Sequence, residues 1–143
     1  MGPSVTVVIP LFNKAPHIRR AIDSVIAQSM PEFELIVVDD ASTDGGGEIV
    51  SAIRDERARL VRRAVRGAGG HAARNLGINE ARTDFIAFLD ADDEWKPHFL
   101  ETVLTMRRRF PAAGAYATAY EIREPNGSAR IPRPQGIPNG AWE

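Results

Sequence analysis

The segment VTVVIP, Val5–Pro10, is a nearly continuous run of apolar, β-branched residues, and it decides how the chain folds. Strands that helices cover on both faces have this composition, because neither face of such a strand meets water. The segment FELIVVDD, Phe33–Asp40, repeats the pattern and ends in two acids. Two such strands predict a parallel sheet buried between helices.

Helical and strand patterns alternate along the rest of the chain. Between residues 17 and 28 apolar side chains recur at the spacing of one buried helix face, and Pro16 suits the first turn. The same criteria predict, in chain order, a short helix ending near Arg54, a strand at Leu60–Arg63, a helix in the second half of residues 66–82, a strand at Thr83–Asp90, a helix from Pro97 to about Phe110 and a strand at Ala115–Ile122. This order predicts an α/β fold with a mostly parallel sheet and helices on both faces.

The bulk composition excludes several classes of protein. The 143 residues suit one domain, and the net charge of -1 gives no reason to expect nucleic acid as a partner. The absence of cysteine excludes disulfides and thiolate metal sites. No apolar run reaches the roughly 18–20 residues that cross a bilayer, and the start does not resemble a signal peptide. We therefore expect a cytoplasmic protein, with membrane association through partners or a longer parent chain left open.

Polar segments follow three of the predicted strands, at the point where each strand ends. The segment PLFNK begins at Pro10, DDASTDG begins at Asp39 and DADDEW begins at Asp90. Ligands bind beyond the carboxyl ends of the strands in open parallel sheets. The three segments therefore predict one site at one edge of the sheet.

Asp90, Asp92 and Asp93 place three carboxylates within four positions. Carboxylates this close repel one another, and a divalent cation would remove that cost. Mg²⁺ usually takes one or two carboxylates together with phosphate oxygens of a substrate, so the acids favour a metal that bridges to a diphosphate. The alternative is an acidic turn that caps the helix expected from Pro97.

Four other features each leave two interpretations open. Asp39 and Asp40 serve either turn chemistry or hydrogen bonding to a base imide or a ribose hydroxyl. The glycines at 67, 69 and 70, which precede Arg74, form either a phosphate loop or a surface turn. Trp95 either stacks on a ligand or packs in the core. The arginines between residues 54 and 66 could bind phosphate, but a solvated surface is the favoured interpretation.

The segments VVIPLFNK, ELIVVDDASTDG and GGHAARNLGINEARTDFIAFLDADDEW together resemble the family 2 glycosyltransferases of GT-A fold, in the same order and at similar spacings. The resemblance covers about residues 4–122. It implies a Rossmann-like nucleotide-binding half and inverting transfer from a nucleotide-diphosphate sugar, with Mn²⁺ or Mg²⁺ as the cofactor. The implied partners are a UDP-sugar before other donors, and an acceptor sugar or lipid-linked glycan, in the synthesis of cell-envelope polysaccharide.

The resemblance also implies roles for individual residues. Pro10, Phe12 and Asn13 would line the nucleotide pocket. Asp40 would contact the base, with Asp39 beside it, and Arg74 would lie near the donor. Asp90 and Asp92 of the DxD-like segment would complete the nucleotide site. The metal would be held by Asp92 and Asp93.

In one respect the chain departs from the family pattern. Family members carry a second half that holds the acceptor and supplies a carboxylate as general base, and no residue here matches that base. We expect residues 1–124 to form an incomplete nucleotide-sugar-binding domain, and residues 125–143 to be a Pro/Gly-rich tail or the start of the acceptor half. The general base is expected beyond Glu143, so the isolated chain should transfer little sugar and should self-associate through exposed apolar surface.

Two alternatives remain. A sugar nucleotidyltransferase also combines an α/β sheet with Mg²⁺-binding acids, but that class usually opens with a Gly-rich basic loop, where this chain has PLFNKAPH. A non-catalytic module that binds nucleotide sugars is favoured by the missing second half.

Overall fold

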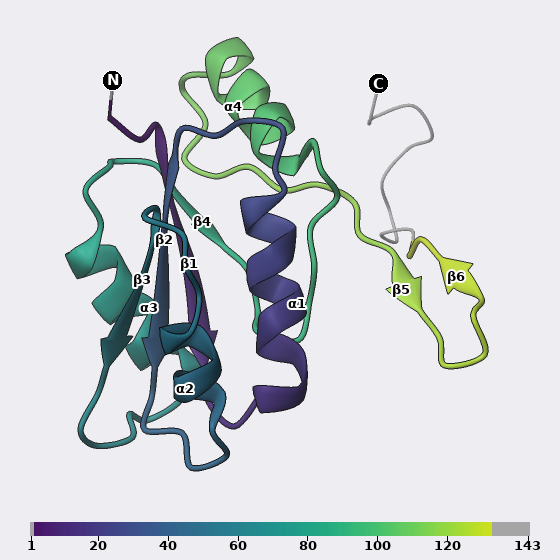
Figure 1. The fold of residues 1–143 in the computed structure, drawn as a ribbon. Helices are drawn as coiled ribbons and strands as arrows, with labels where there is room; N and C mark the ends of the chain where they lie inside the picture. Colours follow the sequence, from purple (N-terminus) through teal and green to yellow (C-terminus); the bar gives the residue numbers. More distant parts are fainter. Residues whose placement is uncertain (1, 133–143) are drawn as a thin grey trace. The chain divides into compact units, whose positions relative to one another are not determined.

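The computed structural model describes residues 2–132 (Figure 1). Contacts divide the chain into two compact units, Met1–Thr102 and Val103–Glu143. Among residues 2–132, no helix combines the length and the hydrophobicity that crossing a membrane requires.

The first unit is built on a four-stranded sheet in the order β3-β2-β1-β4, and every neighbouring pair is parallel. The strands are β1 (Val5–Leu11), β2 (Phe33–Asp39), β3 (Ala58–Arg62) and β4 (Ile86–Phe88). The helices that connect or follow them are α1 (Ala15–Ile26), α2 (Gly46–Ser51), α3 (Gly70–Glu80) and α4 (Phe99–Arg109), the last of which continues into the second unit.

Helices cover both faces of the sheet (Figure 1). On one face Val8, Ile36 and Val38 form a core with Ala73 of α3. Neighbouring residues of a strand point to opposite faces, so Leu11 faces the other side, where it lies close to Gly46 of α2. The predicted α/β class, with a mostly parallel sheet between helices, is confirmed, and the central strands β1 and β2 are almost entirely buried.

Helix α3 approaches the sheet unusually closely. A Cβ atom placed on Gly77 would lie 2.3 Å from Cγ1 of Val8, which is too short for any real contact. Only glycine fits at this position without a shift of the helix or the strand. This contact sets the distance of α3 from β1, and the first turns of α3 carry Arg74.

One strand prediction is too long and another is wrong. The strand expected at Thr83–Asp90 forms over three residues, Ile86–Phe88, and as an outer strand it leaves Phe88 exposed. The strand expected at Ala115–Ile122 does not form: within the described residues, 115–121 have no strand partner. A residue pattern of alternating small and aromatic side chains does not make a strand where no neighbouring strand completes the ladder.

The loop expected from Pro125 onward also needs correction. Strand β5 (Ile122–Arg123) pairs antiparallel with β6 (Ala129–Arg130) in the second unit. Between them Gly127 has a φ of 83° and donates its N–H to the carbonyl oxygen of Glu124 at 2.9 Å. An Asn-Gly pair is a strong hairpin signal, and it was available in the sequence. Residues 133–143 of the expected tail lie outside the described residues.

Candidate functional site

The three polar segments lie together beyond the carboxyl ends of the strands. The backbone N–H of Asn13, after β1, donates to Oγ of Ser42, after β2, at 3.1 Å. The ammonium of Lys14 lies 2.6 Å from Oδ2 of Asp92, in the segment that follows β4. Residues about 80 positions apart therefore meet at one edge of the sheet, as expected for the site of a parallel α/β fold.

Asn13 fixes the shape of the turn that follows β1. Its φ of 49° lies in the left-handed region, which asparagine tolerates better than most residues. Its side-chain carbonyl accepts the backbone N–H of Thr43 at 2.9 Å, which joins this turn to the loop after β2. The same loop caps α1, because Oδ2 of Asp44 accepts the N–H of Ala15 at 2.8 Å. This bond is the main cause that lowers the pKa of Asp44.

Asp39 and Asp40 have different surroundings although they are neighbours. Oδ1 of Asp39 accepts the N–H of Ser42 at 2.9 Å, which is the turn chemistry considered above. The Asp40 carboxylate reaches instead to the segment after β3, where its Oδ1 accepts the N–H of Gly67 at 2.9 Å and lies 3.3 Å from Nε of Arg63. Asp40 is therefore the acid that connects the carboxyl ends of β2 and β3.

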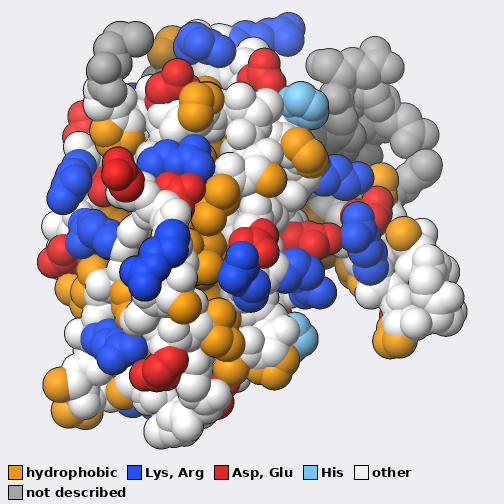
Figure 2. All heavy atoms as spheres, in the orientation of Figure 1, with side chains coloured by type: hydrophobic (Ala, Val, Ile, Leu, Met, Phe, Trp, Pro, Cys, Tyr) orange, Lys and Arg blue, Asp and Glu red, His pale blue; other side chains and the backbone are white. Residues whose placement is uncertain are grey.

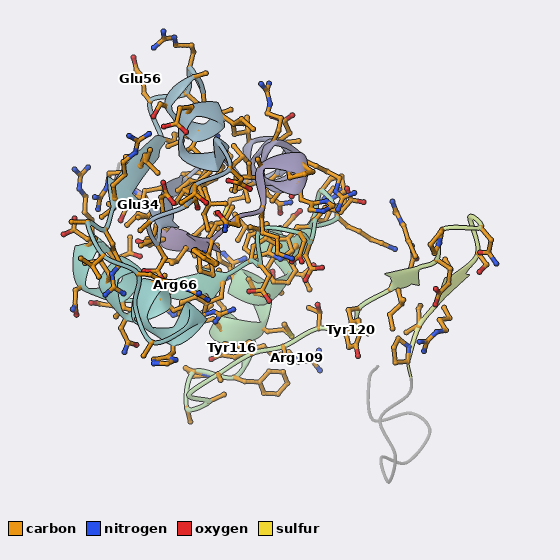
Figure 3. All side chains as sticks on the ribbon, turned by 90° about the horizontal axis from the view of Figure 1, so that it is seen from below. Glu34, Glu56, Arg66, Arg109, Tyr116 and Tyr120 are labelled. Carbon is orange, nitrogen blue, oxygen red and sulfur yellow. The ribbon has the colours of Figure 1, made fainter. Side chains whose placement is uncertain are left out.

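Arg66, in the same segment, lies against Phe12. Its guanidinium carbon is 3.8 Å from the centre of the Phe12 ring, a cation–π contact (Arg66 is labelled in Figure 3). Sequence analysis placed Phe12 in the nucleotide pocket but favoured a solvated surface for Arg63 and Arg66. Both belong to an arginine-rich stretch that looked like solvated surface, and the Gly-rich connection was the only signal that they fold back over the site.

The three acids of the DADDEW segment do not share one partner. Asp92 pairs with Lys14, whereas Asp90 forms a short ion pair with Arg74. Arg20 of α1 donates to the backbone carbonyl of Asp92 at 2.8 Å and thereby holds the segment in place. Arg74 thus lies beside the acids, as the position of its motif suggested, and Lys14 is a further cation that sequence analysis did not single out.

These contacts shift the proton affinity of the acids in opposite directions. The hydrogen bond from Lys14 lowers the pKa of Asp92, and the same bond raises the pKa of Lys14. Burial, followed by the charges of Asp92 and Asp90, raises the pKa of Asp93. Asp93 is therefore the carboxylate on which mutual repulsion acts and which a further cation would relieve.

The acidic side chains of the site suit a metal ion that is bound together with a substrate, rather than one that the protein holds by itself. Within residues 2–132, no three side chains of the ligating types His, Asp and Glu lie close enough together to hold an ion. Asp92 and Asp93 together offer the one or two carboxylates that Mg²⁺ usually takes when phosphate oxygens complete its shell. The residues present are thus compatible with a metal–diphosphate ligand.

Two other features flagged in the sequence have structural explanations. The ring of Trp95 stacks on Phe99 with 4.1 Å between the ring centroids, so it packs within the protein. Three arginines of the 54–66 stretch pair with nearby acids: Arg57 with Asp55, Arg59 with Glu80 and Arg62 with Glu48. Figure 2 shows basic and acidic side chains interspersed over the visible face, which agrees with the solvated-surface interpretation.

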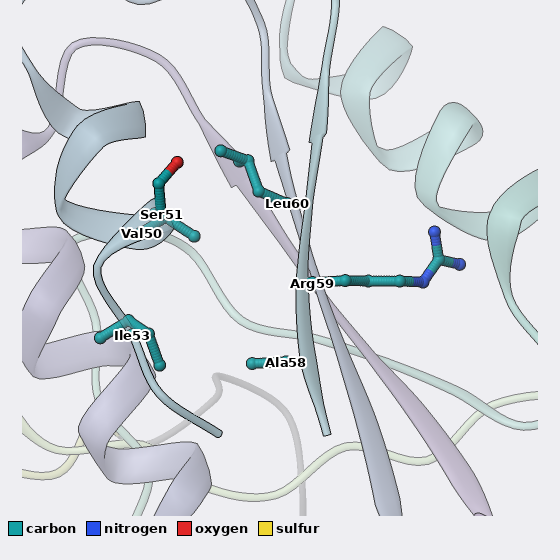
Figure 4. A pocket seen from close by; sticks show the side chains of 6 residues that line it. All are labelled: Val50, Ser51, Ile53, Ala58, Arg59 and Leu60. Carbon is teal, nitrogen blue, oxygen red and sulfur yellow. The ribbon is translucent and has the colours of Figure 1, made fainter. Parts of the chain in front are cut away.

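A hollow of about 120 Å³ lies elsewhere, between α2 and β3. It is lined by Val50, Ser51, Ile53, Ala58, Arg59 and Leu60, and the side chain of Arg59 extends away from the others (Figure 4). None of the predicted site residues lines it, so it is separate from the candidate site.

Residues 6–139 match the family model described as Glycosyl transferase family 2. The chain belongs to this family. Among its relatives, the succinoglycan biosynthesis protein ExoO of Rhizobium meliloti is 45% identical over 114 residues, which are 79% of this chain and 31% of ExoO. The chain spans half or less of the length of the first curated relatives that it matches.

Two solved structures have the same fold. Staphylococcus aureus TarS 1-349 in complex with UDP-GlcNAc has a TM-score of 0.71 at 24% identity, over 87% of this chain and 41% of that one. The mannosyltransferase PcManGT of Pyrobaculum calidifontis, in complex with GDP-Man and Mn²⁺, has a TM-score of 0.59 at 34% identity, over 66% of this chain and 29% of that one.

Proposed function

We propose that this chain is the donor-binding part of an inverting glycosyltransferase, and that it binds a UDP-sugar together with Mn²⁺ or Mg²⁺. The proposal rests on one observation: the segments that follow β1, β2 and β4 lie together and bring Lys14, Asp40 and Asp92 to one edge of the sheet. Family membership supports transferase chemistry. The UDP-GlcNAc complex of TarS supports a uridine donor, and the GDP-Man complex of PcManGT keeps a guanosine donor as the alternative. The name of ExoO supports a role in polysaccharide synthesis.

In this proposal the nucleoside occupies the space between the turn after β1 and the segment after β3. The Asp40 carboxylate accepts a hydrogen bond from the imide N–H of the base, while Asp39 keeps the adjacent turn in place. Arg66 lies over one face of the Phe12 ring, and in this proposal the base stacks on the other face. Pro10 and Asn13 shape the turn that carries Phe12.

The diphosphate lies beside the acids of the DADDEW segment. Asp92 and Asp93 would hold the divalent ion, which when bound neutralises the diphosphate and stabilises it as the leaving group. Asp90 orients Arg74, whose guanidinium can bind phosphate oxygens. Deprotonation of the acceptor hydroxyl requires a carboxylate that we do not identify among these residues, so the isolated chain should bind the donor and transfer little sugar.

A binding experiment tests this proposal directly. Calorimetry with UDP-, GDP- and dTDP-sugars, each with Mn²⁺ and with EDTA, should show that UDP-sugars bind best and that binding requires the metal. Asp93→Asn should weaken metal-dependent binding at least about tenfold, which corresponds to about 1.4 kcal/mol. Asp84→Asn is the matched control, because it makes the same change at an exposed position before β4, at the opposite end of the sheet.

The outcomes separate the alternatives. Equal affinity in EDTA and Mn²⁺ would contradict the metal site, and tight binding of a nucleoside triphosphate with a sugar phosphate would favour a nucleotidyltransferase. Robust sugar transfer by the isolated chain, with a monodisperse monomer in light scattering, would contradict both the missing base and the expected self-association. Donor binding without transfer, even by the longest natural form of the protein, would favour a non-catalytic module.

A further inference from the structure

The backbone of Lys14 is held by hydrogen bonds, whereas its side chain is partly exposed. Lys14 is the residue that precedes α1, and its carbonyl oxygen accepts the N–H groups of His17 at 2.9 Å and Ile18 at 3.0 Å. The neighbouring Ala15 N–H is held by Asp44. The side chain itself is 43% exposed, so the ammonium can change partners without any movement of the backbone.

The Lys14 ammonium occupies the point where the negative charge of the site is concentrated. It lies 2.6 Å from Oδ2 of Asp92. Besides Asp92, both Asp90 and Asp93 raise the pKa of Lys14, so the field of all three carboxylates acts on this one cation. Lys14 at Asp92 and Arg74 at Asp90 thus each supply positive charge beside the acids, and Lys14 is the one in contact with a predicted metal ligand.

Lys14 and a divalent cation compete where both use Oδ2 of Asp92. The ammonium takes a lone pair of Oδ2, and two cations at one carboxylate oxygen repel each other. The segment need not move when Lys14 leaves, because Arg20 separately holds the backbone carbonyl of Asp92 at 2.8 Å. A released lysine ammonium is a compact point charge of the kind that binds phosphate oxygens.

We propose that Lys14 exchanges partners during donor binding: it neutralises Asp92 in the free chain, leaves Asp92 when a divalent cation binds there, and then contacts the diphosphate of the nucleotide. This inference rests on the proposed function and adds to it a residue with two opposite effects. Lys14 competes with the metal when the metal binds alone, and it helps the nucleotide to bind once the metal is present.

The test uses Lys14→Met, which removes the charge and keeps an unbranched side chain. The matched control is Arg19→Met, which removes an exposed cation of α1 that pairs with Asp23, four residues on, in the described part of the chain. Two affinities are measured by calorimetry on the full 143-residue chain: that for Mn²⁺ alone, and that for UDP at saturating Mn²⁺. Thermal melts establish that all proteins are folded.

Lys14→Met should bind Mn²⁺ alone about three- to fivefold more tightly. It should bind UDP in the presence of Mn²⁺ about three- to fivefold more weakly. Both changes have the size expected when one exposed ion pair is lost. Arg19→Met should change neither affinity. A purely structural Lys14 would lower both affinities together with the melting temperature, and that result would overturn the inference.

Three further outcomes would also overturn it. If Lys14→Met binds Mn²⁺ more tightly but UDP as well as the wild type does, Lys14 only competes with the metal and does not exchange. If the wild-type chain binds neither Mn²⁺ nor UDP, the proposed function fails and the inference fails with it, whereas normal wild-type binding with unchanged variant affinities overturns the inference alone.

Discussion

Two buried acids on one face of the sheet, Glu34 and Asp40, have opposite kinds of surroundings. Glu34 lies near the start of β2 and Asp40 directly after its end, and they are 6% and 3% exposed. Their separation of six positions places both side chains on the face covered by α3. A carboxylate is thus buried at each end of β2.

Glu34, labelled in Figure 3, binds groups of β1 and of the segment before β4. Its Oε1 accepts the hydroxyl of Thr6 in β1 and the N–H of Arg82, each at 2.6 Å, and its Oε2 lies 3.9 Å from Nε of both Arg59 and Arg82. Among the described residues, the Asp40 carboxylate contacts the segment after β3, through Gly67 and Arg63. A carboxylate that ties strands together contributes stability, whereas one held by a connecting segment can exchange its hydrogen bonds for those of a ligand.

The largest effect expected from this comparison is a loss of stability on Glu34→Ala. The change removes the buried acceptor for Thr6 and Arg82 and the weaker of two acidic neighbours of Arg59, which keeps its ion pair with Glu80. We expect the free energy of unfolding to fall by about 3 kcal/mol, measured by urea denaturation. Glu34→Gln, which keeps the size and one acceptor, should lose less. The folded fraction should bind UDP and Mn²⁺ normally; weaker binding would show that the two ends of β2 are not independent.

Asp40→Ala should give the reverse pattern, with an effect on binding rather than on stability. Loss of the carboxylate should weaken UDP binding at least about tenfold, or about 1.4 kcal/mol, in calorimetry with Mn²⁺. Asp40→Asn keeps an acceptor for Gly67 and serves as the control for loop structure. If Asp40→Ala binds UDP normally but melts several degrees lower, Asp40 is a structural acid like Glu34 and the contrast disappears.

The smallest effect concerns Asp55, which pairs with Arg57 near the surface at 2.7 Å. The hydrogen bond from Arg57 lowers the pKa of Asp55 below 3.8 in the folded chain. The pair therefore stabilises the fold above the ordinary carboxyl pKa and loses this contribution as the pH falls through the lowered value. Asp55→Asn should cost about 0.5 kcal/mol at pH 7, and urea denaturation should show the difference from the wild type shrinking at acid pH. A difference that grows on acidification would contradict the assignment.

The sheet could be predicted from the sequence where burial is complete and not where it is partial. The runs at Val5–Pro10 and Phe33–Asp40 each contain four consecutive apolar residues, Val7–Pro10 and Leu35–Val38, so their strand character follows from composition. The outer strand β4 was predicted too long, because its apolar residues do not reveal where the ladder with β1 stops. The hairpin of β5 and β6 was missed although Asn126 and Gly127 signalled its turn.

The residues of the candidate site also fall into two groups, those that the sequence could predict and those that it could not. Asn13, Asp40 and the acids of the DADDEW segment stand in recognisable motifs at strand ends, so they could be proposed in advance. Lys14 and Arg66 could not, because a single lysine or arginine has the composition of ordinary surface. Their importance appears only from their partners, Asp92 and the ring of Phe12, which lie far away in the sequence. The individual roles of the predicted residues remain predictions for the variants above.

Because Gly77 lies so close to Val8, a substitution at position 77 would disturb the candidate site although residue 77 is not part of it. Any side chain at position 77 would meet the β1 side chain at less than a contact distance and would push α3 outward. Because Arg74 lies one turn earlier in the same helix, that displacement would also separate it from Asp90. Position 77 is therefore a place where conditional alleles could arise: a small residue such as alanine, costing about 1–3 kcal/mol of packing, could leave the protein active at low growth temperature and inactive when the cell is warmed.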